Sequence, residues 1–426
     1  MFMDLTFLQI ILMLGSFLLT FQGILTLIWM LYAWESPRLA KKRRSPRRFA
    51  EPAYSFTALV PMRHEEKVAI DTIKAISRIN YPDKLKEIII ICRHDDNETI
   101  NKVQEVISEI DNGNNSVIVL VDSYPINKPL SLNQGLLQAR NQIVTIFDAE
   151  DEPHPEIYNI VNTIMIKKGV DVVQSGVQLM NYNSHWFSAL NAMEYYLWFK
   201  SGLHFFTDVG NVSFLGGNTV FFKRSLLTKV GGWDENSLTE DADIGLRLTL
   251  QGAKTKVIYD EKHVTKEETP SSVESFIRQR TRWNQGFLQM LLKGDWRKLQ
   301  GLKQKLVTLY VLSAPVSPIV LFIYIPLGIW VSLTQKFPVV YAMFTYMPFY
   351  VLFGILSVQI LGLWQFTRTC KLKFYWYMPI KLIASFFPYI GLLTFSALRA
   401  IARVFKSSNS WEKTSHLNLH REKLAA

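Results

Sequence analysis

Cysteine is scarce in this sequence: Cys92 and Cys370 are the only two among its 426 residues. Because they form no CxxC pair, neither a structural zinc site nor a disulfide framework is indicated, and a reducing compartment fits. The sequence also lacks a GxGxxG motif and a GxxxxGKS/T motif, so the usual dinucleotide fingerprint and the P-loop are excluded. It contains no internal repeat and no low-complexity tract.

Acidic residues are outnumbered by basic ones. The chain has 36 Asp and Glu against 47 Lys and Arg, which gives a formal net charge of +11. On a soluble protein, such an excess would suggest nucleic-acid binding. Here it accompanies 49% hydrophobic residues and a positive mean hydropathy of +0.09. This combination favours membrane lipid, and not nucleic acid, as the partner of the basic residues.

Four long apolar runs flank a region of ordinary composition. The first, residues 5–34, is nearly uncharged and exceeds the ~20 residues that a spanning helix needs. No basic residue precedes it and it is too long for a signal-peptide core, so we expect a permanent helix. The other runs are 306–333, 339–366 and 375–402. The chain therefore divides into an N-terminal helix with a basic segment (1–50), a central domain (51–294) and a C-terminal membrane region (295–426).

Basic residues predict how the chain is oriented. Seven Lys and Arg lie between positions 38 and 48, directly after the first apolar run. The positive-inside rule then places the central domain in the cytosol and the N-terminus outside, in a multi-pass protein of the plasma or inner membrane. The last apolar run is interrupted by Lys381 and Pro388 and has basic segments on both sides. We therefore expect it to be re-entrant or interfacial and not a full span.

The central domain alternates strands with helices. The expected strands are 56–60, 87–92, 117–121 and 143–147, and the expected helices are 68–78, 99–110 and 131–139. Continuous β-branched runs of this kind predict an α/β fold with a mostly parallel sheet covered on both faces. In such sheets, ligands bind at the carboxyl ends of strands. The polar clusters 63–65, 94–96 and 148–151 fall at those ends.

The cluster after the fourth expected strand contains three carboxylates, Asp148, Glu150 and Asp151. They would repel one another without a positive charge nearby. Mg²⁺ and Mn²⁺ prefer oxygen ligands and commonly bind through one or two carboxylates together with substrate phosphates. A solvated acidic turn is the simpler alternative, but the position at a strand end favours a metal site.

A second acidic motif, Thr239-Glu240-Asp241, precedes a segment with a helical pattern. Thr239 could cap that helix, and acidic residues in a first turn suit the helix dipole. The functional alternative is a carboxylate general base, which contributes ~10²–10⁴-fold to reactions of poor nucleophiles.

A third motif lies on a predicted helix, where the spacing puts Gln279, Arg282 and Trp283 near one face. Arginine is suited to clamping a diphosphate, and tryptophan offers an apolar face to a sugar ring. An amphipathic helix at a membrane surface would also be rich in Arg and Trp, so the motif alone does not decide between the two interpretations.

Several motifs follow one another in a characteristic order. They are VPMRHE at 60–65, DD at 95–96, KPLSLNQG at 128–135, DAED at 148–151, GGN at 216–218, GGW at 231–233, TED at 239–241 and QRTRW at 279–283. Over about residues 54–294, this ordered set resembles the family-2 inverting glycosyltransferases, the group that includes bacterial cellulose, hyaluronan and exopolysaccharide synthases. The resemblance implies a cytosolic catalytic domain with a GT-A (Rossmann-like) fold between transmembrane helices.

The resemblance also implies a role for each motif. The implied residues are Asp241 for the catalytic base; Glu65, Asp96, Lys128, Asp148, Gln279 and Arg282 for the nucleotide and donor; Asp148 and Glu150 for Mg²⁺ or Mn²⁺; and Gly217, Asn218 and Trp283 for the acceptor. Glu150 stands where the family usually has the second Asp of a DxD motif, and Asp151 follows it, so either could reach the metal. Arg63-His64 replaces the usual Tyr-Asn, so contacts to the nucleoside are expected to differ.

The expected donor is a nucleotide-diphosphate sugar, with a UDP-sugar favoured, and the expected acceptor is a glycan or a lipid. The favoured function is processive synthesis of a secreted β-linked polysaccharide. The alternative is a single transfer onto a membrane lipid, as in ceramide or diacylglycerol glucosyltransferases. A non-catalytic membrane scaffold or transporter is more remote, because Asp241, Arg282 and Trp283 are all present.

Overall fold

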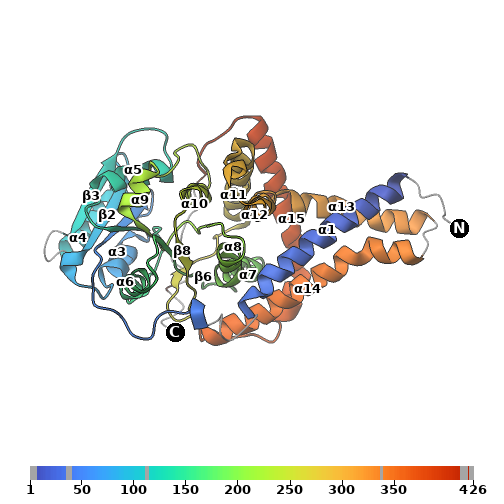
Figure 1. Cartoon of the computed structure of the whole chain (residues 1–426), viewed down its shortest axis with the longest axis horizontal. Coiled ribbons are helices and arrows are strands. Elements are labelled where there is room, and N and C mark those ends of the chain that lie inside the picture. Colours follow the sequence, from blue (N-terminus) through green and yellow to red (C-terminus); the bar gives the residue numbers. More distant parts are fainter. Residues whose placement is uncertain (1–6, 35–40, 111–114, 336–338, 413–420, 422–426) are drawn as a thin grey trace.

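A computed structural model describes residues 7–34, 41–110, 115–335, 339–412 and 421 of the chain. Its centre is a seven-stranded sheet with the order β3-β2-β1-β4-β7-β5-β8 (Figure 1). Neighbouring strands are parallel, except that β7 is antiparallel to β4 and β5. The strands are β1 (Phe56–Met62), β2 (Lys86–Arg93), β3 (Ser116–Val121), β4 (Ile143–Ile146), β5 (Val172–Gln174), β7 (Val220–Lys223) and β8 (Thr255–Val257). The predicted α/β fold with a mostly parallel sheet is confirmed.

Helices cover both faces of this sheet, because its strands present apolar side chains alternately to either side. Ala58 and Val60 of β1 face a core shared with α3, α4 and α6. Leu59 faces the opposite core, shared with α5, α9 and α10. The helices are α3 (Ala69–Ser77), α4 (Asn97–Ile110), α5 (Lys128–Gln138), α6 (Ile157–Lys168), α9 (Arg224–Lys229) and α10 (Glu240–Leu250). The three predicted helices are present, with α5 beginning earlier than expected.

A second group of elements lies between the sheet and the apolar helices. It comprises a parallel pair, β6 (Val177–Leu179) with β9 (Thr265–Glu267), and α7 (Ser188–Leu197), a π turn (Trp198–Gly202), α8 (Leu203–Asp208), α11 (Val273–Lys293) and α12 (Leu302–Leu312). Short 3₁₀ turns occupy Tyr32–Trp34, Asp83–Leu85 and Asp295–Lys298. α11 carries the QRTRW motif. It is capped by Ser272, whose Oγ accepts the N–H of Ser275 at 3.1 Å, and it ends at the left-handed Gly294.

Within the described ranges, four helices are long and apolar enough to cross a membrane. They are α1 (Phe7–Leu31), α13 (Val316–Thr334), α14 (Val339–Thr369) and α15 (Met378–Phe405). The first three project together from one side of the molecule (Figure 1). α1 and α14 approach closely at Gly23, where an added Cβ would lie 2.5 Å from Cγ1 of Val351. Small residues permit this kind of close packing between apolar helices.

α15 lies across the other three apolar helices and not along them (Figure 1). Near its start, Lys381 Nζ donates to Asn183 Oδ1 of the central domain at 2.7 Å. Near its end, Arg403 Nε donates to Gln285 Oε1 of α11, also at 2.7 Å. Both ends of this helix therefore contact the same domain.

One face of α15 remains exposed and apolar. Its members recur at helical spacing and are Ile380, Ile383, Phe387, Phe395 and Leu398. A helix that packs one side on a domain and leaves such a stripe on the other has the form expected at a membrane surface. The re-entrant or interfacial placement expected from Lys381, Pro388 and the flanking basic residues stays a prediction, since α15 is also long and apolar enough to cross a membrane.

We expect a cysteine introduced at Ser408 to resist an impermeant maleimide added outside intact cells, and to react after permeabilisation. The reason is that residue 408 returns to the central domain: its backbone carbonyl accepts a hydrogen bond from Gln285 Nε2 at 2.7 Å. A cysteine at Thr334, at the far end of α13, should react from outside and serves as the control. Labelling at position 408 in intact cells would instead show that α15 crosses the membrane as a fourth full span.

Candidate active site

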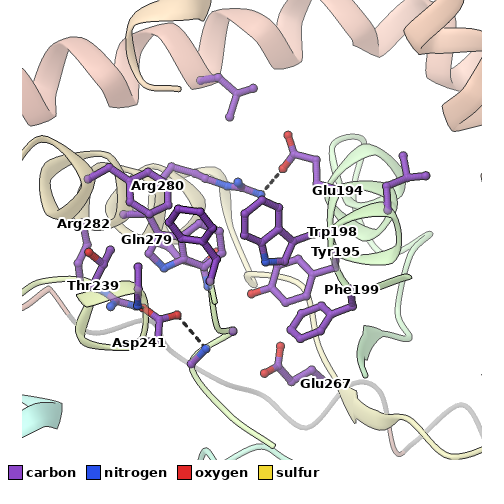
Figure 2. A pocket seen from close by; sticks show the side chains of 18 of the residues that line it. Glu194, Tyr195, Trp198, Phe199, Thr239, Asp241, Glu267, Gln279, Arg280 and Arg282 are labelled. Carbon is purple, nitrogen blue, oxygen red and sulfur yellow. Dashed lines mark hydrogen bonds and ion pairs between the residues drawn. The ribbon is translucent and has the colours of Figure 1, made fainter. Parts of the chain in front are cut away.

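A cavity of about 660 Å³ opens at the carboxyl ends of β1 and β4. Asp148 and Asp241 line its part nearest the sheet, and the same cavity continues to Leu19 of α1, Val351 of α14 and Leu393 of α15. Figure 2 shows how side chains from distant segments converge on it. Most of the polar groups that the sequence singled out thus share one cavity with the apolar helices.

Three carboxylates form a tight cluster in this cavity. Oxygens of Asp148, Glu150 and Glu267 all lie within 4.8 Å of one another. Burial, reinforced by repulsion from Asp148 and Glu65, raises the pKa of Glu150 well above its ordinary value. Burial and the charges of Glu150 and Asp148 do the same to the pKa of Glu267. Such an oxygen-rich, mutually repelling set fits a divalent cation, which would relieve the repulsion.

Asp151 faces a different direction from Glu150. Its Oδ2 accepts the backbone N–H of Asp148 at 2.8 Å, and its Oδ1 accepts Asn218 Nδ2 at 2.8 Å. Asn218 also donates to Glu267 Oε1 at 2.5 Å. Asp151 is therefore engaged in holding the loop together, whereas Glu150 belongs to the carboxylate cluster. This geometry favours Glu150 as the metal ligand, and it gives Asn218 contacts to carboxylates that the sequence did not suggest.

Lys128 is the cation nearest the cluster. Asn127 caps α5 by accepting the N–H of Leu130 at 3.0 Å, which puts Lys128 in the first turn. Its Nζ forms an ion pair with Asp148, lies 3.7 Å from Glu240 Oε1 and donates to the carbonyl of Gly217 at 3.1 Å. Burial lowers the pKa of Lys128, but the two carboxylates outweigh it and raise that pKa above its ordinary value.

Asp241 lies at the start of α10, with both carboxylate oxygens held by backbone amides. Oδ2 accepts the N–H of Gly217 and Oδ1 that of Ala242, each at 2.8 Å. Burial raises the pKa of Asp241 above its ordinary value, although these two hydrogen bonds lower it. Burial also raises the pKa of the adjacent Glu240, to about 7. Thr239 occupies the capping position but makes no side-chain cap hydrogen bond, so the predicted cap is wrong, whereas Glu240 and Asp241 do lie in the first turn of the helix.

The QRTRW motif lines the cavity from α11. Arg282 Nη1 donates to the carbonyl of Leu238 at 3.2 Å, while Arg282 Nε and Gln279 Oε1 are buried without a hydrogen-bond partner among the described residues. Trp283 packs against Tyr195, with ring centroids 6.1 Å apart. Buried polar atoms left without partners are uncommon in folded proteins, so these two indicate groups that meet a ligand.

The two acidic residues expected at the nucleoside differ in position. Glu65 lines the cavity. Asp96 is not among the lining residues of the described chain, and it accepts the backbone N–H groups of His64 at 2.5 Å and of Thr99 at 3.3 Å. Asp96 therefore caps α4 and fixes the loop after β1. Its part in nucleoside binding stays a prediction.

Residues outside the sequence motifs also reach the site. Glu267 completes the carboxylate cluster from β9. Trp411 stacks on Arg282, with the guanidinium carbon 4.3 Å from the ring centroid. Arg421 Nη2 donates to the carbonyls of Glu150 and Asp151, at 3.3 and 2.8 Å. The tail's tryptophan and basic residues were visible in the sequence, but no local pattern connects them to segments more than a hundred positions away.

Residues 52–286, more than half of the chain, match the family described as glycosyltransferase-like family 2. This chain belongs to that family. The match covers most of the motifs discussed above, and it confirms the family resemblance deduced from their order.

Individual relatives are distant. The probable glycosyltransferase YdaM of Bacillus subtilis is 25% identical over 244 residues, 56% of either chain. The β-monoglucosyldiacylglycerol synthase of Nostoc is 26% identical over 273 residues, 61% of this chain and 56% of that relative. The poly-β-1,6-N-acetyl-D-glucosamine synthase of Staphylococcus aureus is 26% identical over 274 residues, 64% of this chain and 63% of that relative. The chain thus spans somewhat more than half the length of these relatives.

Among solved structures, a mannosyltransferase from Pyrobaculum calidifontis, in complex with GDP-Man and Mn²⁺, resembles this chain with a TM-score of 0.60. The likeness covers 92% of this chain and 99% of that one at 17% sequence identity. At that identity it concerns the fold, and it agrees with the glycosyltransferase fold expected for family 2.

Chelation with EDTA should abolish sugar transfer, and Mg²⁺ or Mn²⁺ should restore it. Glu150→Gln and Glu267→Gln should each weaken Mn²⁺ binding to the purified protein in the presence of UDP, measured by electron paramagnetic resonance, because each removes a cluster oxygen. Asp151→Asn is the control, since its oxygens are bound to Asp148 and Asn218. A larger loss of Mn²⁺ binding in Asp151→Asn than in Glu150→Gln would reassign the ligand.

Proposed function

We propose that this protein is an inverting glycosyltransferase that transfers a sugar from a nucleotide-diphosphate donor, with a UDP-sugar favoured, to the growing end of a β-linked glycan. One observation carries the proposal. A single cavity contains the carboxylate cluster, the buried Asp241 and the aromatic Trp283, and continues to the apolar helices. Donor, base and acceptor positions are therefore adjacent, and the acceptor can extend away from them.

Charged residues indicate which half of the cavity would bind the donor. A divalent cation bound by Asp148, Glu150 and Glu267 would neutralise part of the diphosphate and so stabilise it as a leaving group. Lys128 and Arg282 add fixed positive charge next to it. Gln279, whose Oε1 has no partner in the described part of the chain, and Glu65, on the cavity wall, are placed to contact the donor.

Asp241 supplies the base in this proposal. The acceptor hydroxyl oxygen attacks the anomeric carbon from the face opposite the diphosphate, and the bond from that carbon to the diphosphate oxygen breaks as the new glycosidic bond forms. The hydroxyl proton passes to Asp241. Its raised pKa makes this carboxylate a stronger base than an ordinary aspartate, and the amides of Gly217 and Ala242 fix its orientation.

The acceptor half of the cavity is aromatic near the base. Trp283, Tyr195 and Trp198 all line it, and aromatic faces suit the apolar faces of pyranose rings. Gly217 and Asn218 line the same cavity. Because a stacking surface accepts each successive sugar in the same way, this wall supports repeated addition.

Transfer to a lipid is the second candidate, and the membrane end of the cavity favours it. There the lining is mostly aliphatic and includes Leu321, Val351, Leu352, Ile390 and Leu393. An acyl or isoprenoid chain would be accommodated by such side chains. The family relatives fit either candidate, since one is named for a polysaccharide and another for a glycolipid.

For its location, we propose a plasma or inner membrane with the catalytic domain in the cytosol. The basic residues after α1 support this orientation under the positive-inside rule. Of that basic stretch, Arg38 lies outside the described residues. An odd number of full spans, with α15 at the membrane surface, would leave both the catalytic domain and the C-terminal tail on the cytosolic side.

Asp241→Asn should retain donor binding and lose at least ~10²-fold in turnover, because the amide cannot accept the proton. In the parent enzyme, a base is active above its pKa, so acidification should reduce turnover at a pH above the ordinary aspartate value of 3.8. Asp243→Asn is the control: it is a buried aspartate on the same helix, bound to Arg247 and Lys293. Turnover of Asp241→Asn within a few-fold of the parent would remove Asp241 as the base.

Membranes incubated with a panel of labelled UDP- and GDP-sugars should yield polymer that resists lipid extraction. Trp283→Ala should shorten or abolish this polymer while nucleotide binding persists, because only the stacking surface is lost. Trp186→Ala, a tryptophan outside the described cavity lining, should leave product length unchanged. If the parent membranes give only a monoglycosylated, solvent-extractable lipid, the second candidate replaces the first.

A further inference from the structure

An ion pair on the acceptor side of the cavity is not used by the mechanism above. Arg280 of α11 pairs with Glu194 of α7 through Glu194 Oε2 (Figure 2). The hydroxyl of Tyr389 on α15 donates to the same oxygen at 2.7 Å. Arg280 Nη2 also donates to Asn191 Oδ1 at 2.6 Å. Three helices therefore meet at one carboxylate.

The position of this pair follows from the geometry of α11. Successive residues of an α-helix are rotated by about 100°, so Arg282, Gln279, Trp283 and Arg280 follow one another around its surface in that order. Arg282 and Gln279 face the donor half. Trp283 comes next, and Arg280 lies beyond it, with its guanidinium carbon 4.6 Å from the centroid of a Trp283 ring. Glu194, which binds Arg280, thus lies on the side of Trp283 that is turned away from Gln279 and Arg282.

Glu194 is placed to meet a solute. Its side chain lines the cavity and is 27% exposed. Arg280 and Tyr389 both bind Oε2, and no hydrogen bond involves Oε1 within the described ranges. A charged group in a largely apolar cavity is costly unless its hydrogen-bonding capacity is met. Arg280 and Tyr389 satisfy the hydrogen-bonding capacity of Oε2 and leave Oε1 available.

We propose that Glu194 is an acceptor-binding residue whose Oε1 accepts a hydrogen bond from a hydroxyl of the unit next to the one that reacts. The chemistry at this position selects a hydroxyl-bearing unit, such as a second sugar. An acyl chain or an ester-linked glycerol at the same level has no donor to offer, and would leave the carboxylate oxygen desolvated without a partner. Ile390 and Leu393, which follow Tyr389 along α15, also line the cavity. The inference rests on the proposed glycosyltransferase function.

Two detergent-like acceptors test the assignment: octyl β-glucoside and octyl β-cellobioside, which share a tail and differ by one sugar ring. The full-length protein in nanodiscs is supplied with the UDP-sugar that the parent turns over. The parent should prefer the cellobioside by about 10-fold or more in kcat/KM, as expected when a built polar site is filled. In Glu194→Leu this preference should fall to within about 3-fold of unity through KM, because the hydrogen-bond acceptor is lost.

Conservative variants separate binding from folding. Glu194→Gln, whose amide oxygen still accepts a hydrogen bond, should keep most of the preference. If Glu194→Leu does not fold, Tyr389→Phe tests the role of Glu194 instead. This variant removes the hydroxyl that donates to the Glu194 carboxylate. It should raise KM for the cellobioside and leave KM for the glucoside unchanged. Glu261→Gln is the matched control, since Glu261 forms a comparably buried pair with Lys200, with 2.7 Å between the charged atoms, outside the described cavity lining.

The outcomes distinguish the two proposals. Release of nucleotide in the absence of acceptor should be equal in the parent and Glu194→Leu, which shows that the donor half is intact. Three results would overturn the role of Glu194 and leave the glycosyltransferase proposal standing. They are an unchanged cellobioside preference in folded Glu194→Leu, no preference in the parent, and donor turnover without use of either probe. Absence of any donor turnover by the parent would instead remove the proposed function.

Discussion

The site depends on holding several carboxylates together where little water reaches them. Asp148, Glu150 and Glu267 lie within 4.8 Å of one another, and burial with mutual repulsion raises the pKa values of Glu150 and Glu267. Such a cluster is unfavourable unless positive charge or hydrogen-bond donors compensate it. Lys128 supplies one fixed cation and Asn218 supplies donors. A divalent cation would supply the remaining positive charge. The repulsion among the buried carboxylates, which is unfavourable for folding, therefore favours binding of a metal and a diphosphate.

Backbone amides compensate and position another carboxylate of the site, Asp241. Asp241 is held by two amide N–H groups, one of them from Gly217. The loop carrying Gly217 is fixed in turn by Gln174, whose Oε1 accepts the N–H of Gly216 at 2.9 Å and whose Nε2 donates to the carbonyl of Asn218 at 3.1 Å. Because a side chain at position 217 would come within 4 Å of Asp241 and Lys128, its absence keeps open the space between base and cation. The precision of the site thus comes from turns and amides as much as from the charged side chains.

α11 and α15 connect this site to the apolar helices. α11 presents Arg282 on one side and contacts α7 and α15 on the other. Arg403 and Ser408 bind Gln285 of α11 directly. Trp411, just beyond α15, stacks on Arg282. A displacement of α15 would therefore reach Gln285 and Arg282 of α11 through short, direct contacts. The membrane region is accordingly part of the site and not only an anchor.

Local patterns in the sequence determined the alternation of strands and helices, the four apolar helices, the order of the family-2 motifs and the acidic strand end. These follow from hydrophobic periodicity and from residue types that act over a few positions. Only the tertiary structure placed Glu150 in the carboxylate cluster and Asp151 against the backbone amide of Asp148 and the side chain of Asn218. It also brought Glu267, Glu194 and Trp411 to the cavity. Their positions depend on the packing of segments far apart in the chain, which no local pattern records.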